Sequence, residues 1–288
     1  MIRLLKILVL LVLLLAGAAL AGIWYIGAWH ILFPSSAHDR VAPPLPVNLG
    51  SPAVLVFSKT NQFRHKEGIA GGHEALREIV AQNGWDSFHT ENGAVFNSVD
   101  LEKFDAVVFL NATGDMLSPD QRSAMRQWIE GGGGWLGIHA AGDGSHAVWP
   151  WYMENLIGAE FTAHIMGPQF QIATVTLDNA DHPALAGLPN VWDHEEEWYS
   201  WKASPRVNGF TILATVDEDS YTPEINWMGK HVNLRMGDHP VVWSNCVGLG
   251  RSLYAAMGHR AEAFAEPNFR RLLRNGLRWL MDRTAASC

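Results

Sequence analysis

One short segment of the sequence places a histidine among small residues. His139 lies within 137–143 (GIHAAGD), directly after the apolar end of a predicted strand. Small neighbours permit a tight turn, and we expect that turn to push the His139 side chain into solvent. Asp143 lies four positions later and would face the same way if a helix follows. Such a pair suits a general base or an oriented metal ligand, whereas the alternative is a histidine that only satisfies backbone groups at a strand end.

Three further histidines occupy positions from which they could join His139. His65 lies within 63–67 (FRHKE), just after the first predicted strand, and His259 follows the last predicted strand. Loops at the carboxyl ends of neighbouring parallel strands share one rim of the sheet, so we expect these side chains to converge there. His164 lies in a loop and is a candidate for substrate binding. For each of them the alternative is an ordinary solvated loop histidine.

An acidic segment is followed at once by aromatic residues. Residues 193–199 read DHEEEWY. An acidic run is normally a solvated face, but carboxylates beside aromatic rings also suit the binding of sugar hydroxyls or acid–base catalysis. We take Glu197 as the functional carboxylate, and Trp198 and Tyr199 as substrate-binding residues.

The elements that must position these residues follow from the apolar pattern. Continuous apolar runs at 53–57, 106–110 and 135–138 predict strands buried on both faces, and 85–89 predicts one more. Helices are expected between them; one begins with Ser118 as N-cap, Pro119 at its first position and Gln121 completing a capping box. This alternation predicts an α/β fold, a three-layer α/β/α arrangement of flavodoxin-like plan with a mostly parallel sheet.

The second half of the domain is less regular. Further strands are predicted at 171–177 and 211–216, a hairpin turns at 248–250, and a helix spans 267–281.

The N-terminus reads as a membrane anchor. Arg3 and Lys6 precede an apolar run that continues to residue 33, long enough to cross a hydrocarbon core of roughly 30 Å. The positive-inside rule predicts a single-pass protein with a cytoplasmic N-terminus and an extracytoplasmic domain. The competing interpretation is a signal peptide cleaved after Ala21. We divide the chain into an anchor at 1–33, a Pro-rich linker at 34–52 and a domain at 53–283.

The composition of the chain limits which classes of molecule it could bind. Hydrophobic residues make up 48% of the chain and the net charge is −8, which indicates a globular domain and argues against a nucleic-acid partner. Cys246 and Cys288 form no CxxC or zinc-ribbon pattern, so we expect no disulfide framework.

The domain resembles the ThuA-like (trehalose-utilisation) family, which is related in fold to the class I glutamine amidotransferases. The resemblance rests on FRHKE, on SPDQRSAMRQWIEGGGGWLGIHAAGD, on DHPALAGLP, on EEWY and on GLGRSLYAAMGH, which occur in the family's order and cover nearly the whole domain. In amidotransferases a nucleophilic cysteine occupies the elbow that His139 holds here, so the resemblance implies no cysteine-dependent amidotransferase. It implies carbohydrate metabolism, on a keto-sugar or a disaccharide.

These observations lead to one main hypothesis and one rival, besides a third possibility, a structural relic of the fold that is kept for interactions. The first is an enzyme, a carbohydrate-active hydrolase or isomerase, in which Glu197 or His139 moves a proton and His65, His259 and Asp143 assist. In a variant of it, His65, His139, His259 and Glu197 hold a divalent metal, although no HxH or HExxH spacing supports this. The rival is a non-catalytic sugar-binding or sensing module at the cell surface.

Overall fold

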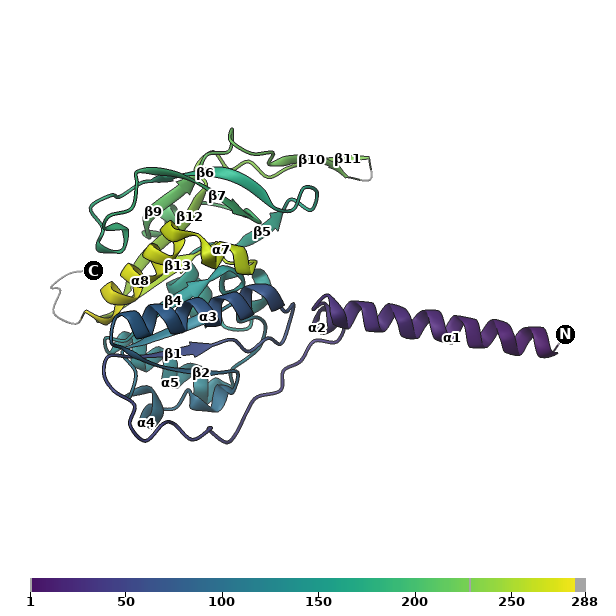
Figure 1. Cartoon of the computed structure of the whole chain (residues 1–288), viewed down its shortest axis with the longest axis horizontal. Coiled ribbons are helices and arrows are strands. Elements are labelled where there is room, and N and C mark those ends of the chain that lie inside the picture. The colour runs from purple at the N-terminus through teal and green to yellow at the C-terminus, as the bar shows by residue number, and fades with distance from the viewer. Residues whose placement is uncertain (1, 228, 283–288) are drawn as a thin grey trace.

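A nine-stranded mixed sheet organises the domain. The computed structural model describes residues 2–227 and 229–282, and its strands run in the order β2-β1-β3-β4-β13-β12-β9-β6-β7 (Figure 1). The first five strands are mutually parallel, and each later neighbour is antiparallel to the one before it. The parallel part has the strand order of flavodoxin-like sheets, with β13 in the fifth place.

The parallel strands are built from the apolar runs of the sequence. They are β2 (Asp86–Thr90), β1 (Ala53–Phe57), β3 (Ala106–Leu110), β4 (Gly134–Ile138) and β13 (Gly250–Ala255). Every residue of β1, β3, β4 and β13 is buried, whereas the more polar β2 is half-buried at the edge. Strands buried on both faces are mostly apolar, and for this reason the bounds of β1 and β3 could be predicted from the sequence.

The antiparallel part extends the same sheet. Its strands are β12 (Pro240–Val247), β9 (Thr211–Val216), β6 (Gln171–Leu177) and β7 (Val191–Glu196). Two small ribbons accompany it, one of β5 (Phe161–His164) with β8 (Tyr199–Trp201) and one of β10 (Glu224–Trp227) with β11 (Lys230–Asn233). The pairing of β12 with β13 confirms the predicted hairpin.

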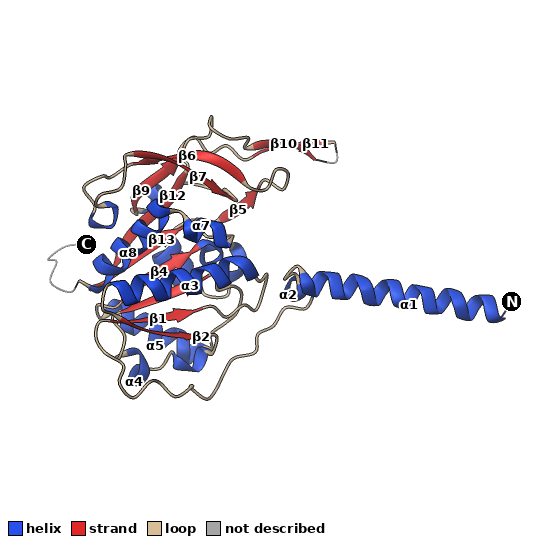
Figure 2. Ribbon diagram, viewed as in Figure 1, coloured by secondary structure: helices blue, strands red, loops and turns tan. Residues whose placement is uncertain are grey.

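Helices cover both faces of the parallel part (Figure 2). One layer contains α3 (Lys66–Gln82), α7 (Ala261–Ala265) and α8 (Pro267–Met281), and the other contains α4 (Ser98–Leu101) and α5 (Pro119–Glu130). The capping box of α5 is present as predicted, with Ser118 accepting from the Gln121 backbone and Gln121 returning the bond. The three-layer α/β/α architecture is therefore confirmed.

Shorter helical turns complete the domain. Segment α6 (Pro150–Tyr152) continues into a π-helical turn at Met153–Ile157. The 3₁₀ turns are Gly93–Val95, His139–Gly142, Gly144–His146, Pro183–Leu185 and Pro205–Asn208.

The N-terminal helix stands away from the domain. Helix α1 (Ile2–Tyr25) buries none of its residues, and α2 (Trp29–Leu32) follows it (Figure 1). The mean hydropathy of α1 reaches 2.8, and its length and composition fit either a membrane span or a signal sequence. The linker after it lies along the domain: the Asp39 carboxylate accepts from the Gly93 amide at 2.9 Å and pairs with Lys59.

One expectation about the cysteines is wrong. Cys246 on β12 takes part in a disulfide bond, although the spacing of the cysteines suggested none. Cys288, the other cysteine of the sequence, lies outside the described residues, as does Arg283 at the end of the expected domain. Spacing rules apply to short local motifs and carry no information about cysteines that the fold brings together.

Candidate functional site

His139 lies in a strained turn at the end of β4. Its φ is 49°, one of two positive values among the described non-glycine residues, and the other belongs to Asn111. Side chains rarely adopt this conformation, and it concentrates at functional sites. The Asn111 amide spans the neighbouring turns, accepting from the Ala140 amide and donating to the Gly258 carbonyl.

The expectation that this turn would push His139 into solvent is wrong. The His139 side chain is fully buried. The Tyr199 ring lies 4.2 Å from it between centroids, and the rings of His65 and His259 lie at 4.9 and 5.0 Å. The turn therefore directs His139 inward, beneath side chains contributed by other loops.

The surroundings of His139 fix its tautomer. Its Nδ1 lies 2.7 Å from the carbonyl oxygen of Ala256 and must donate, because a carbonyl can only accept. The other nitrogen, Nε2, then points to Glu197 Oε2 at 3.5 Å and to His259 Nδ1 at 3.1 Å. A ring N–H held by a backbone carbonyl is the arrangement that orients metal-binding histidines.

Four of the predicted residues converge on one point. His65, His139, Glu197 and His259 each offer one ligand atom, and these atoms lie within 4.8 Å of one another. The four come from the loops that follow β1, β4, β7 and β13. Three histidines and one carboxylate form a donor set that suits a divalent metal such as zinc.

Glu197 connects the cluster to two further side chains. Its Oε2 lies 3.0 Å from His259 Nδ1, while its Oε1 lies 3.0 Å from His164 Nδ1 and accepts from the Gln169 amide. Burial favours the neutral acid, but the hydrogen bonds and charges of His139 and His259 outweigh it and hold the pKa of Glu197 well below its usual range. Glu197 is therefore ionised at neutral pH.

The histidines of the cluster titrate differently. Burial, followed by the charges of His139 and His259, lowers the pKa of His65 well below its usual value. Its buried Nδ1 has no hydrogen-bond partner among the described residues. Burial lowers the pKa of His139, but the neighbouring carboxylates of Glu197 and Glu196 outweigh this effect and raise the pKa. His65 thus presents a neutral ring with a free nitrogen, which is the form that binds metals.

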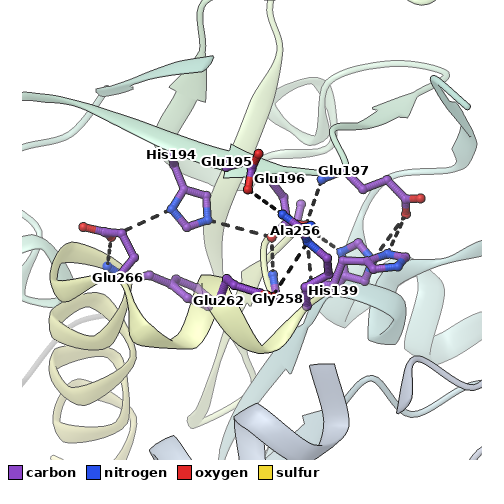
Figure 3. Close-up of polar contacts among 12 residues, drawn as sticks. His139, His194, Glu195, Glu196, Glu197, Ala256, Gly258, Glu262 and Glu266 are labelled. Carbon is purple, nitrogen blue, oxygen red and sulfur yellow. Dashed lines mark hydrogen bonds and ion pairs between the residues drawn. The ribbon is translucent and has the colours of Figure 1, made fainter. Parts of the chain in front are cut away.

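A second carboxylate, that of Glu196, was not predicted from the sequence and holds the backbone next to the cluster (Figure 3). Glu196 accepts from the Gly258 and His259 amides at 2.6 and 3.3 Å. His194 lies 3.8 Å from Glu196 and 3.8 Å from Glu266, at ion-pair rather than hydrogen-bond range. Burial lowers the pKa of His194, but these two carboxylates outweigh it and raise that pKa to about 9.

Alternation along β7 could have revealed Glu196. Its burial pattern shows that Trp192, His194 and Glu196 face inward while the residues between them face solvent. No such pattern in the sequence pointed to Gln169 or Asn111. Each lies in a loop, and only the folded chain brings that loop to the site.

Two predicted residues lie apart from the cluster. Asp143 accepts from the Ser145 amide and lies 3.7 Å from His146; among the described residues no hydrogen bond or ion pair joins it to His139. The expected helix is a 3₁₀ turn that ends before Asp143, so the four-residue spacing does not align the two. Trp198 is buried and donates to the Gln171 carbonyl, so its ring is not available for stacking on a sugar.

A cavity of about 500 Å³ opens onto the cluster. Its lining includes His65, His259, Gln169, Phe63 and Phe170. A volume of this order suits a small organic ligand.

Comparisons with known proteins agree with the fold. The family model for ThuA, described as trehalose utilisation, matches residues 53–280. A ThuA-like protein from Bacteroides uniformis superimposes with a TM-score of 0.69 and 26% identity, covering 83% of this chain and 95% of that one. A ThuA-like protein from Parabacteroides merdae gives a TM-score of 0.62 and 18% identity, over 83% and 93% of the two chains. No curated protein matches significantly.

Proposed function

The chain belongs to the ThuA (trehalose utilisation) family, and we propose that it is an enzyme acting on a small carbohydrate at a divalent-metal site. The substrate class is a keto-sugar or a disaccharide, and the reaction a hydrolysis or an isomerisation. One observation carries the proposal: His65, His139, His259 and Glu197 bring their ligand atoms within 4.8 Å of one another, and two of them, His65 and His259, also line a cavity.

The four residues fit a metal ion in their chemistry. His139 is oriented by the Ala256 carbonyl, the buried Nδ1 of His65 has no hydrogen-bond partner among the described residues, and Glu197 is ionised. Glu197 already accepts from His259, whereas burying a ring nitrogen of His65 without a partner is unfavourable. A bound divalent cation would polarise a carbonyl or hydroxyl oxygen of the sugar.

Proton transfer is best assigned to His164. We expected Glu197 or His139 in this role, but the depressed pKa of Glu197 makes it a weak base, and His139 is fully enclosed. The side chain of His164 is 23% exposed and bonded to Glu197. Burial lowers the pKa of His164, so its ring is neutral at pH 7 and can accept a proton from a sugar hydroxyl or from a carbon next to a carbonyl.

The arrangement supports an enzyme over a non-catalytic sugar-binding module. The aromatic residues expected to stack on a sugar, Trp198 and Tyr199, are only 4% and 3% exposed, so stacking by a binding module would fall to Phe63 and Phe170 of the cavity. Catalysis needs several titratable groups close together, and the contacts of Glu197 with His164 and His259, each at 3.0 Å, support this assignment.

We also propose that α1 stays attached as a single-pass anchor, with Arg3 and Lys6 in the cytoplasm and the domain outside.

Metal content of the purified full-length chain tests the proposal. We expect about one divalent ion per chain in wild type, measured by mass spectrometry, and its loss in Glu197→Gln, which keeps the shape but removes the charge. Glu195→Gln, two positions away and solvent-facing, is the matched control and should retain the metal. Turnover is then assayed with trehalose and keto-sugars. A wild-type chain that binds neither zinc, manganese nor cobalt would contradict the metal site.

A further inference from the structure

The end of the N-terminal helix is bonded to the loop that carries His65. The Arg64 amide donates to the Gly27 carbonyl at 3.0 Å, and the Lys66 ammonium bonds the carbonyl oxygens of Trp24 and Tyr25. Gly27 is buried with a φ of 84°, and a Cβ there would lie 2.3 Å from the Arg64 carbonyl oxygen. A glycine is therefore required at this contact, which fixes the helix end on both sides of His65.

This contact places apolar side chains at the mouth of the candidate site. Tyr25 and Ile26 line the same 500 Å³ cavity as His65 and His259. They are 74% and 60% exposed; Tyr25 is the last residue of α1, and Ile26 directly follows it. The cavity is thus lined by His65 and His259 together with a mixed rim, in which Tyr25 and Ile26 lie beside charged residues such as Lys66 and Arg260.

The direction of α1 determines what the cavity faces. Helix α1 projects from the end of the domain at which β1 terminates, the carboxyl edge of the parallel strands (Figure 1). The linker lies bonded along the domain, with the Lys59 ammonium donating to the Ala37 carbonyl at 2.9 Å. If α1 spans a bilayer, the carboxyl edge faces the membrane surface and the cavity opens beside the lipid headgroups.

We propose that the substrate is a sugar covalently attached to a membrane lipid, taken from the leaflet on the domain's side. This rests on the proposed function and specifies its substrate class. The sugar enters the cavity toward His65 and His259, while the acyl chains stay in the bilayer along Tyr25 and Ile26. Confinement to the leaflet raises the effective concentration of such a substrate at the cavity mouth well above that of a soluble sugar.

The position of the cavity relative to the bilayer is tested first. Glu67→Cys at the cavity mouth and Gln82→Cys at the other end of α3 are labelled with bimane in full-length protein in phosphatidylcholine nanodiscs. The two sites lie about 22 Å apart along one helix. Spin-labelled lipids should quench the label at 67 strongly and the label at 82 weakly. Equal quenching at both sites overturns the proposal.

A matched pair of glycine variants tests the contact itself. Gly27→Ala should reduce quenching at position 67, because the added Cβ forces the helix end off the Arg64 backbone. Gly22→Ala, within α1, adds a Cβ that meets no atom of the described residues within 4 Å, and this variant should behave as wild type. Unchanged quenching in Gly27→Ala would show that the contact does not hold the cavity at the membrane.

Substrate class is tested with two probes that share one head group. Trehalose 6-palmitate in the nanodiscs is compared with free trehalose, using the fluorescence of the label at 67. We expect a response to the lipid at about a tenfold lower concentration than to the free sugar. An equal response to both, or no response to either, overturns the proposal. Metal content is measured on the same samples, so a chain that keeps its metal but ignores the lipid refutes the lipid substrate and leaves the metal site intact.

Discussion

At the scale of single residues, the site is defined by how each ring nitrogen is used. His139 donates a hydrogen bond from Nδ1 to the Ala256 carbonyl, so Nε2 is the nitrogen that can bind a ligand. A buried nitrogen of His65 has no hydrogen-bond partner in the described part of the chain, and Glu197 is held ionised. The sequence identified the residue types, but the tautomers and charges depend on neighbours that only the fold supplies.

Glu196 provides a residue-scale prediction. It accepts from the Gly258 and His259 amides and so positions the His259 ring without contributing a ligand atom. Glu196→Gln should weaken metal affinity by about 10- to 100-fold, because a supporting hydrogen bond is replaced by a poorer one. Competition with a chelator of known affinity measures the change. If the variant binds metal as tightly as wild type, Glu196 has no positioning role.

At the scale of elements, β7 and α8 are joined behind the site. His194 from β7 lies between Glu196 and Glu266, and Glu266 also caps α8 by accepting from the Asn268 and Phe269 amides. His194 thus connects β7 with the start of α8 through Glu266. Through Glu196, it is also connected to the loop that carries Gly258 and His259. The protonated ring of His194 compensates the negative charges of two carboxylates, which a neutral side chain could not do.

This link makes stability depend on pH. The pKa of His194 is raised from 6.5 to about 9 in the folded chain. Its contribution, up to about 3 kcal/mol, is therefore complete below pH 6.5 and is lost as pH rises through 9. Thermal unfolding of the full-length chain from pH 6 to 10 should show this loss in wild type. His194→Gln should be less stable at pH 6 and lack the step, so parallel curves for both proteins would contradict the assignment.

At the scale of the whole molecule, the N-terminal helix α1 ends at the same edge of the sheet as the site. The residues that follow β1, β4, β7 and β13 meet at the carboxyl edge of the parallel strands, and the end of α1 is bonded to the first of these loops. Parallel strands gather their following loops at one rim, which is why distant segments could be expected together. Nothing in the local sequence indicated that the anchor reaches the same rim.

Retention of the anchor is the prediction at this scale. The intact mass of the membrane-extracted protein should include residues 1–21, because the apolar run continues past Ala21 to the contact at Gly27. The protein should also stay in the membrane after carbonate washing. A mature chain beginning at Gly22 and released into solution would instead establish a cleaved signal peptide.

The sequence by itself determined the elements and the family. Strands β1, β3, β6 and β9 and helix α8 have the bounds predicted for them, because continuous or alternating apolar patterns and helix caps act over a few neighbouring residues. Only the tertiary structure decided the inward turn of His139, the different partners of Glu196 and Glu197, the separation of Asp143 from His139, and the contact of the end of α1 with the loop that carries His65. Each of these depends on residues far apart in the chain, as with His139 and His259, which are 120 positions apart and 3.1 Å from nitrogen to nitrogen. Local pattern carries no record of such contacts, since they arise only when the packed sheet brings its loops to one edge.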